Sequence, residues 1–374
     1  MQTNVWRKWI GAGLLCLFGM VLFAQPISVG PLKSNHCQGI AVDQRQGYIY
    51  YSFTTMLIKT DLQGRVLGSV TGLLGHLGCL TFNEADGRVY GSLEYKMDEI
   101  GRGILKSEGQ DRQLPNAWYI AIFDGDRITR EGMSYTDEGV MTAVYLPTVV
   151  ADYEAEAGGK PHRYACSGID GVTFGPAFGK ADGKRYLTCA YGIRGDTTRT
   201  DNDYQVLLQY DASDWPTRYE RPLTQDDMHH SGPEQPLGKY FAYTGNTSWG
   251  VQNLNYDVRR NRWLMFVYPG KKSAFRNHTL YVVDGSIAPR EEPLKGMPTA
   301  EKGQVLTLLC EGDYDAPTGV YGWESKYGVF GAASLKDGSF YLVQAMDCPK
   351  GMEGAVLHRY EWTGEVPTPF RRIE

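Results

Sequence analysis

Three kinds of short apolar run recur in a fixed order along the chain. The first kind ends at a turn and occurs at 39–43, 79–83, 171–175, 253–257 and 332–336. The second is rich in Tyr and β-branched residues and occurs at 47–52, 87–91, 184–188, 261–265 and 338–342. The third closes on an acidic residue and occurs at 57–61, 120–124, 207–211, 280–284 and 357–361. Runs of this length, bounded by turn residues, are typical of β-strands, so the pattern predicts five copies of one sheet unit.

A fourth strand completes each unit before the next copy begins, as in residues 66–70. Four-stranded antiparallel units repeated in sequence predict a β-propeller, because radial closure leaves only short, protected sheet edges. We therefore expect an all-β fold, a β-propeller with five repeats visible in the sequence. Three stretches, 136–167, 221–248 and 291–328, are long inserts or degenerate blades, so the sequence allows five to seven blades.

The acid that ends each third run has a structural interpretation. An Asp at the first position of a β-turn accepts hydrogen bonds from backbone N–H groups. We interpret the five residues at this position as turn formers: Asp61, Asp124, Asp211, Asp284 and Glu361.

The first 24 residues differ from the repeats. Arg7 and Lys8 precede an uncharged apolar run at 10–23, and a small residue, Ala24, follows. This order is typical of a secretory signal peptide, and the run is shorter than the roughly 20 residues that span a bilayer. We predict cleavage after Ala24, one propeller domain over 25–374, export to the periplasm or the extracellular space, and no membrane insertion of the mature chain.

Composition narrows the function classes. The chain of 374 residues is 42% hydrophobic and 22% charged, as expected of a globular protein. Its 43 acidic residues outnumber its 38 basic residues and give a net charge of -5. Nucleic-acid-binding domains normally carry a basic excess, so we predict no nucleic-acid partner, and any anion site must be local.

Cysteine usage leaves the redox state open. Loss of Cys16 with the signal peptide leaves six cysteines, and an even number in an exported protein permits disulfides. Four of them fall in or beside predicted strands, where a small buried thiol packs well: Cys37, Cys79, Cys166 and Cys189. We favour free buried cysteines over pairs. The chain has no C-x-x-C motif with the spacing of a structural zinc site.

Loop length indicates which face of the propeller carries function. The loops that lead into the innermost strands and those between the second and third strands share one face. The second-to-third connections expand to 94–116, 191–203, 268–278 and 346–353. Binding residues concentrate on such loops above a rigid scaffold, so we expect the functional site on this face.

Two histidines occupy one position in neighbouring blades. Alignment of the first runs superposes 35–38 on 75–78, which places both histidines toward the channel mouth. A His near its unperturbed pKa of about 6.5 acts as a general base or a metal ligand. Two acids in segments that lead into other innermost strands would supply a carboxyl pair for glycoside hydrolysis. The candidate catalytic residues are His36, His76, Asp170 and Glu324; as a structural alternative, such residues hold water and tie blades together.

The long loops also carry candidate ligand-binding residues. Basic side chains gather in them although the protein is acidic, and Arg presents a planar fork to a carboxylate or sulfate. Exposed aromatic side chains can stack on sugar rings, and two histidines in an insert can reach the rim. The candidates are Arg194, Arg199, Trp249, Lys271, Lys272, Arg276, Trp323, His229 and His230. Asp196, Asp201 and Asp203 share the Arg194 loop, where local salt bridges are an equal alternative.

The blade landmarks resemble those of exported bacterial propellers of the NHL, gluconolactonase-like and YncE-like kind. This resemblance covers most of the chain after residue 24, rests on general blade features, and implies the fold rather than an activity. The chain is also similar in style to secreted propellers with which gut Bacteroidetes degrade plant polysaccharides, including lyases acting at rhamnose-glucuronate linkages. That resemblance implies a channel-facing His with basic residues around a uronate.

We therefore expect an exported propeller that binds and cleaves an acidic, uronate-containing saccharide by lyase or glycosidase chemistry. β-Elimination beside a uronate needs a cation to neutralise the carboxylate and a base to remove the neighbouring proton. One alternative is a binding module without catalysis, since function does not follow from fold. Another is a gluconolactonase-like metal hydrolase, which would bind one divalent ion in the channel through a Glu, Asn and Asp set, with calcium or zinc as the possible cofactor. No G-x-S-x-G, H-E-x-x-H or P-loop motif occurs in the chain.

Overall fold

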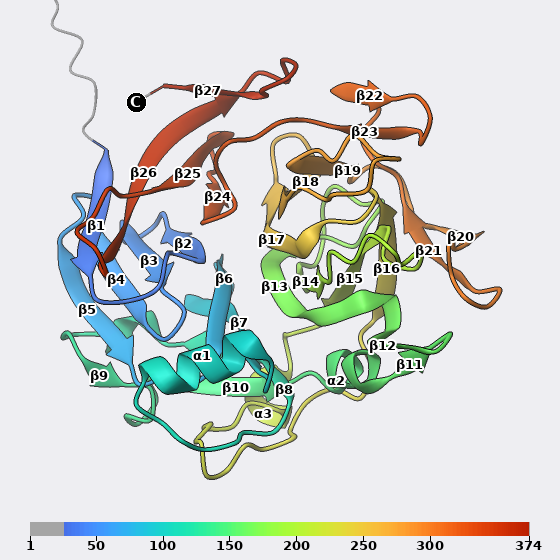
Figure 1. Ribbon diagram of the computed structural model, residues 1–374. Helices are drawn as coiled ribbons and strands as arrows, with labels where there is room; N and C mark the ends of the chain where they lie inside the picture. Colours follow the sequence, from blue (N-terminus) through green and yellow to red (C-terminus); the bar gives the residue numbers. More distant parts are fainter. Residues whose placement is uncertain (1–25, 374) are drawn as a thin grey trace, which may run out of the picture.

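The computed structural model describes residues 26–373, so the predicted signal peptide lies outside the described residues. Five sheets, antiparallel apart from two outer strand pairs, stand around a central channel (Figure 1). The predicted all-β propeller is confirmed, and its three recurrent runs are the innermost, second and third strands of each blade. In the same range, no helix combines the length and the apolar character that a membrane span requires.

Blades 1 and 2 follow the simple order of the repeat. Blade 1 consists of β2 (Gly39–Asp43), β3 (Tyr48–Ser52), β4 (Leu57–Asp61) and β5 (Val66–Thr71), with the short β9 (Met133–Ser134) parallel to β5. Blade 2 consists of β6 (His76–Asn83), β7 (Arg88–Tyr95), β8 (Ala117–Phe123) and β10 (Met141–Tyr145).

Blade 3 has six strands, whereas blade 4 has three within the described range. Blade 3 consists of β13 (Cys166–Gly175), β14 (Tyr186–Ile193), β15 (Tyr204–Tyr210), β16 (Gly238–Tyr243), β21 (Lys302–Leu306) and β20 (Arg290–Pro293). Blade 4 consists of β17 (Ser248–Asp257), β18 (Arg262–Tyr268) and β19 (Leu280–Asp284). After β19 the chain runs to the edge of blade 3, where β21 pairs in parallel with β16, so blade 4 has three strands within the described range.

Blade 5 joins the two ends of the described chain. It consists of β24 (Ala332–Ser334), β25 (Ser339–Ala345), β26 (Glu353–Trp362) and β1 (Ile27–Leu32), and β27 (Phe370–Arg372) also pairs with β26. The first strand of the described chain thus forms the outer strand of the last blade, with Ile27 opposite Leu357 and Val29 opposite Ala355.

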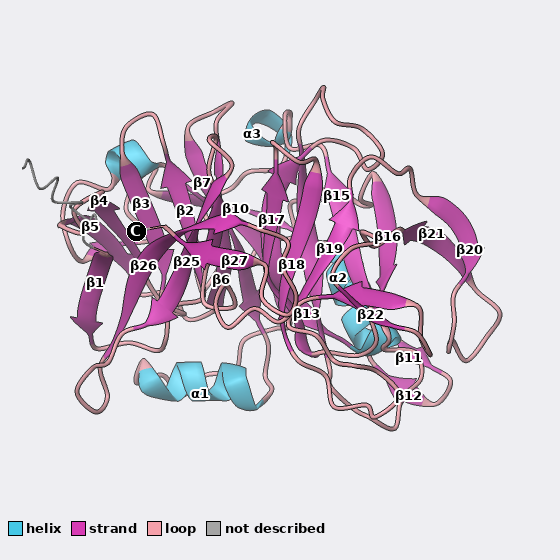
Figure 2. Cartoon of the chain, turned by 90° about the horizontal axis from the view of Figure 1, so that it is seen from above, coloured by secondary structure: helices cyan, strands magenta, loops and turns pink. Residues whose placement is uncertain are grey.

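The three long stretches of the sequence supply outer strands, helices and hairpins, and no further blade is found among residues 26–373. The remaining elements are α1 (Glu99–Ser107), α2 (Pro147–Glu154), α3 (Trp215–Arg218), the 3-10 turns Gly125–Arg127 and Arg163–Ala165, and two small hairpins, β11 (Glu156–Ala157) with β12 (Lys160–Pro161) and β22 (Asp313–Asp315) with β23 (Val320–Gly322). In the second view, α1 lies across one end of the blades, where it covers part of one face (Figure 2).

The core is divided among the blade interfaces. Each of five apolar clusters contains strands from two neighbouring blades, and the cluster between blades 2 and 3 includes Cys79, Tyr90, Val172 and Leu187. The four cysteines predicted to be buried and free are so, and all six cysteines within the described range are free. Propeller sheets bury apolar side chains on both faces, which explains why the first runs are not strictly alternating.

The turn interpretation of the recurring acids is confirmed at four positions. Asp61 Oδ1 accepts hydrogen bonds from the backbone N–H groups of Gln63 and Arg65. Asp124, Asp211 and Asp284 accept the corresponding bond from the residue two positions on. Glu361 instead pairs with Arg371 of β27.

The closing strand generates a stability prediction. Val29 is buried in the cluster between blades 5 and 1, whereas the neighbouring Ser28 is partly exposed on the other face of β1. Val29→Asp places an unpaired charge in that cluster and should lower the free energy of unfolding by about 3 kcal/mol or more. Ser28→Asp, the matched control, should cost below about 1 kcal/mol. Urea unfolding of the two variants tests this; equal losses would contradict a closing role for the apolar face of β1.

Candidate functional site

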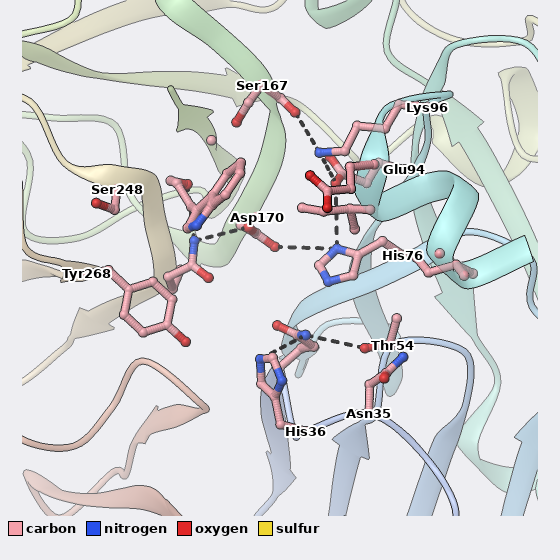
Figure 3. A pocket seen from close by; sticks show the side chains of 18 of the residues that line it. Asn35, His36, Thr54, His76, Glu94, Lys96, Ser167, Asp170, Ser248 and Tyr268 are labelled. Carbon is pink, nitrogen blue, oxygen red and sulfur yellow. Dashed lines mark hydrogen bonds and ion pairs between the residues drawn. The ribbon is translucent and has the colours of Figure 1, made fainter. Parts of the chain in front are cut away.

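A cavity of about 790 Å³ opens at the channel mouth, on the face that α1 crosses (Figures 2 and 3). The segment that leads into β2 supplies His36, and the first residue of β6 is His76. The connection between β7 and β8 supplies Lys96 and one side of α1. Blades 3 and 4 supply Asp170 and Trp249. This is the face that loop length indicated, and the volume lies in the range of small-ligand pockets.

The innermost strands of blades 2, 3 and 4 each carry a β-bulge where they reach this cavity. Their register shifts fall within residues 77–80, 169–172 and 251–253. A bulge re-aims side chains that a regular strand would send to its faces. One position before the first run of each blade, the bulged strands carry Gly78, Asp170 and Gln252. The polar side chains of Asp170 and Gln252 both line the cavity.

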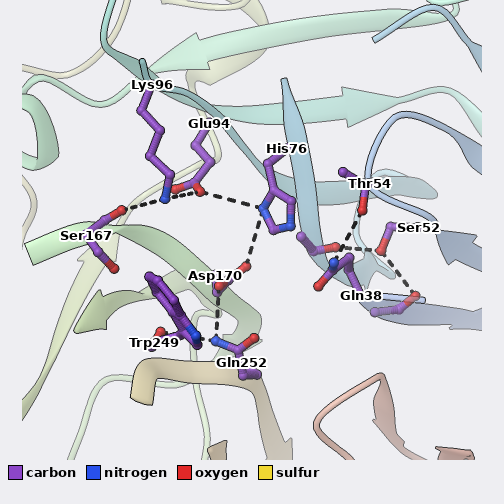
Figure 4. Close-up of polar contacts among 12 residues, drawn as sticks. Gln38, Ser52, Thr54, His76, Glu94, Lys96, Ser167, Asp170, Trp249 and Gln252 are labelled. Carbon is purple, nitrogen blue, oxygen red and sulfur yellow. Dashed lines mark hydrogen bonds and ion pairs between the residues drawn. The ribbon is translucent and has the colours of Figure 1, made fainter. Parts of the chain in front are cut away.

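Two carboxylates converge on one histidine at the wall of this cavity (Figure 4). His76 Nδ1 lies 3.6 Å from Glu94 Oε1 and 4.0 Å from Asp170 Oδ1. Gln252 Nε2 donates to the other oxygen of Asp170 at 3.2 Å. Neither contact of His76 is short enough for a hydrogen bond, so its Nδ1 is a buried nitrogen without a partner in the described structure.

Glu94 is held in a fully bonded arrangement. Lys96 Nζ lies 2.7 Å from Glu94 Oε1, and Trp118 Nε1 donates to Glu94 Oε2 at 3.0 Å. Lys96 Nζ also donates to the backbone oxygen of Ser167 at 2.9 Å. A buried charge is tolerated where it is paired and hydrogen-bonded, and the Glu94–Lys96 ion pair meets that condition.

The protonation states follow from burial and charge. Burial raises the pKa of Asp170 well above its ordinary value, and the negative charge of Glu94 adds to that effect, while Lys96 and the Gln252 hydrogen bond oppose it. Burial lowers the pKa of His76 to about 4, against the attraction of Glu94. The cluster therefore combines a carboxyl group that holds its proton to higher pH than an exposed Asp does with an imidazole that is neutral near pH 7.

His36 and Tyr268 also line the cavity, and Figure 3 shows both below Asp170 in the view. His36 Nε2 lies 3.2 Å from Gln38 Nε2, whose amide also donates to Thr54 Oγ1 at 3.3 Å. Burial lowers the pKa of His36, with Glu353 opposing. Burial, together with the charge of Asp170, raises the pKa of Tyr268 to about 12, so its hydroxyl keeps its proton at neutral pH.

Trp249 presents an exposed indole at the rim. Trp249 is 45% exposed. Its backbone φ is +68°, which is rare for a bulky residue. Gln252 Nε2 donates to the Trp249 carbonyl at 3.1 Å and so supports this conformation. Gly250 must follow it, because a Cβ there would lie 2.2 Å from the Tyr191 carbonyl oxygen.

Most of the basic candidates lie outside the cavity and are paired with acids. Arg199 is buried and binds Asp201 through two nitrogens, in the local pairing that the sequence left open. Lys272 pairs with Asp203 at 2.5 Å, and Arg276 pairs with Asp313 at 2.5 Å. Arg194 lies over the Tyr153 ring. Lys271 lines the cavity and makes no ion pair within residues 26–373.

The other candidates have different neighbours. Glu324 lies outside the cavity and is about half exposed, 3.7 Å from His278 Nδ1. Trp323 is fully buried and packs against Trp362, so its ring offers no face to a ligand. His229 and His230 lie outside the cavity and contact Tyr119 and Tyr145 of blade 2.

Sequence reasoning missed Glu94, Gln38 and Gln252. A signal was present for two of them, since Gln38, Gly78, Asp170, Gln252 and Gly331 all stand one position before the first run of their blades. Glu94 carried a weaker signal, because it ends a second strand and its pairing with His76 depends on the register of β6 and β7.

The residues of this cluster do not fit a divalent metal. A cation beside Glu94 would face the Lys96 ammonium, which already lies 2.7 Å from that carboxylate. Among the described residues, no group of three or more His, Cys, Asp or Glu side chains is arranged to hold a metal ion.

Comparisons with known proteins yield similarity only to solved structures. No protein-family model matches the chain, and no curated protein sequence matches it. A GH43 β-1,3-galactosidase with galactodeoxynojirimycin is 10% identical, with 87% of this chain and 91% of that chain covered and a TM-score of 0.40. Native arabinanase from Bacillus subtilis is 10% identical, with 88% and 96% covered and a TM-score of 0.41. The apo form of a soluble aldose sugar dehydrogenase from Escherichia coli is 11% identical, with 89% and 97% covered and a TM-score of 0.34. At these identities and TM-scores, the similarity carries no information about activity.

The lowered pKa of His76 generates a prediction about acid stability. The unfolded chain takes up a proton on His76 near pH 6.5, whereas the folded chain does so only near pH 4, so falling pH over this interval favours unfolding. His76→Gln removes that contribution and should reduce the acid-induced loss of stability by up to about 3 kcal/mol. Urea unfolding of both proteins between these pH values checks this; parallel losses would contradict it.

Proposed function

We propose that this protein binds an acidic, uronate-containing oligo- or polysaccharide in the channel-mouth cavity and cleaves a glycosidic bond there. The observation that carries the proposal is the meeting, in one cavity, of the buried Asp170 carboxyl with its raised pKa, two neutral imidazoles and an exposed indole. Such a set supplies a proton donor, a base and a surface for a sugar ring.

Saccharide binding is supported by the composition of the cavity wall. The exposed indole of Trp249 presents an apolar face with a polar edge, which suits a sugar ring. The amides of Asn35, Gln38 and Gln252 line the same cavity and offer both donors and acceptors to hydroxyl groups.

Asp170 is the proton donor of the proposed reaction. Its side chain is 14% exposed, so it reaches the cavity while burial keeps its proton in place. A protonated carboxyl gives its proton to the glycosidic oxygen as that oxygen departs, and this requirement is common to elimination and hydrolysis. Asp170 therefore serves either reaction class.

In the elimination route, neutral His36 or His76 removes the proton on C5 of the uronate. The electron pair of that C–H bond forms the double bond to C4, the C4–O bond breaks, and the departing oxygen takes the Asp170 proton. Lys271, the cavity cation without an ion pair among the described residues, neutralises the uronate carboxylate and acidifies the C5 proton. The acidic substrate is thus assigned to one lysine, because the other basic candidates either pair with acids or, like Arg194, lie outside the cavity.

Hydrolysis is a second candidate, favoured by one specific observation. Asp170 and Glu94 both lie within 4.0 Å of the same nitrogen of His76, so the cavity wall contains two carboxyl groups, and burial raises the pKa of Asp170. Asp170 would act as the acid and Glu94, paired with Lys96, as the second carboxyl group. Glu94 replaces Glu324, which lies outside the cavity.

Incubation with uronate-containing and neutral polysaccharides tests the proposal. Unsaturated products absorbing in the ultraviolet indicate elimination, and new reducing ends without that absorbance indicate hydrolysis. Asp170→Asn removes the donated proton while preserving side-chain volume and should lower kcat by about 100-fold or more. Substrates with a good leaving group should lose less. Asp211→Asn, at a surface turn, is the matched control. If the folded protein cleaves none of these polysaccharides, the proposed enzyme activity is wrong and the binding-module alternative takes its place.

Filling the cavity gives a separate test of where the ligand binds. Gly103 of α1 lines the cavity, and a Cβ built there meets no atom within 4 Å, so a side chain would project into open space. Gly103→Phe should weaken saccharide binding at least tenfold without lowering the melting temperature, since Gly is a poor helix former. Lys106→Phe, on the same helix outside the cavity, should bind normally. Isothermal titration compares the two, and unaltered binding in Gly103→Phe would move the site elsewhere.

A further inference from the structure

The cluster around Asp170 contains an ion pair, Glu94–Lys96, to which the elimination route assigns no step. Glu94 and Lys96 line the cavity, but both are buried, and their polar atoms contact each other, Trp118 and the Ser167 carbonyl. Lys96 Nζ also lies 3.6 Å from Asp98 Oδ2. Charges held this deeply interact strongly with a neighbouring acid, because little water screens them. Figure 4 shows the pair beside His76, with Asp170 below it in the view.

The backbone is shaped to bring these groups together. A Cβ on Gly168 would lie 2.0 Å from Glu94 Oε2, and a Cβ on Gly78 would lie 2.4 Å from Asp170 Oδ1. Gly168 therefore leaves room for the Glu94 carboxyl group, and Gly78 leaves room for the Asp170 carboxyl group. Two glycines facing two carboxylates, in adjacent bulged strands, indicate that the separation of Glu94 and Asp170 is fixed by the fold.

We propose that the buried Glu94–Lys96 ion pair sets the acid strength of Asp170, with Glu94 holding the proton on Asp170 and Lys96 limiting that effect. In this role both are positioning residues, since they act on substrate through Asp170. The proposal rests on the proposed function only for its catalytic consequence; its electrostatic content concerns the folded protein alone.

The groups that face Asp170 come from every blade at the cavity wall. His76 stands on β6, Glu94 and Lys96 on β7 and the turn after it, Gln252 on β17, and Tyr268 at the end of β18. His36 and Lys271 complete the polar lining. Glu94 and Lys96 are the charged members that act on Asp170 most strongly, and they do so with opposite signs.

Opposite signs make the proposal testable with two single variants. Glu94→Gln removes a negative charge, so Asp170 should lose its proton at a pH lower by about one unit. Lys96→Met removes a positive charge, so the same proton should be lost at a higher pH. A purely structural role would destabilise the protein in both variants without moving that pH in opposite directions.

The first measurement needs no substrate. The folded-state pKa of Asp170 is raised, so relative to the Asp170→Asn variant the wild type loses stability as pH rises, until the pH passes that pKa. Urea unfolding of the wild type and the Asp170→Asn variant is measured across pH. It gives the pH at which the difference between their free energies of unfolding stops growing. This pH should fall in the Glu94→Gln background and rise in the Lys96→Met background. Glu84→Gln, which breaks the exposed Glu84–Lys336 pair, should leave it unchanged.

The second measurement uses turnover. With a substrate that the protein cleaves, the alkaline limb of kcat against pH should move in the same two directions, changing the rate up to about tenfold at a fixed pH on that limb. If Lys96→Met does not fold, the double variant Glu94→Gln with Lys96→Met takes its place, and its limb should return toward the wild-type position. The proposal would be overturned if neither the alkaline limb of kcat nor the pH at which the stability difference stops growing moved in any background. If that pH shifts but no substrate is cleaved, only the proposed function is overturned.

Discussion

Ring closure is the constraint on which the rest of the structure depends. Each of the five apolar clusters is shared by two neighbouring blades, so no blade buries its faces alone, and the ring is stable only when the first and last blades meet. The pairing of β1 with β26 holds that closure, because one sheet then contains strands from both ends of the described chain. The channel mouth is rigid for the same reason: its walls are the ends of strands that are fixed on both sides.

A rigid mouth allows charges to be buried where they would otherwise be expensive. Removing a carboxylate from water costs several kcal/mol unless a partner and hydrogen bonds replace the lost solvation. Glu94 receives both from Lys96 and Trp118, whereas Asp170 receives one amide hydrogen bond, and burial raises its pKa. Two carboxyl groups on adjacent blades thus lie in different environments, one ion-paired and one not among the described residues, which is an arrangement that suits acid and base chemistry.

The sequence predicted the repeat, and with it the fold, because strand length and turn chemistry are local properties. The same repeat placed His36, His76 and Asp170 at one mouth, since equivalent positions in successive blades must face the channel. The basic candidates were less predictable, because Arg199 and Lys272 find acids on their own or neighbouring loops, and ion pairing depends on loop conformation rather than on spacing. Trp323 was placed by chain position near an innermost strand, but the chain turns there and buries the indole against Trp362.

The position before each first run shows what a repeat can encode beyond its strands. Blades 1, 3 and 4 have Gln38, Asp170 and Gln252 there, while blades 2 and 5 have Gly78 and Gly331. The glycine of blade 2 is required by the acid of blade 3, because a side chain at Gly78 would occupy the space of the Asp170 carboxylate. A symmetric ring with five identical polar residues would crowd the channel and leave buried groups unpaired. The variation in residue type at this one position therefore indicates the site better than the repeated strand pattern does. It can be found from the sequence once the blades are aligned.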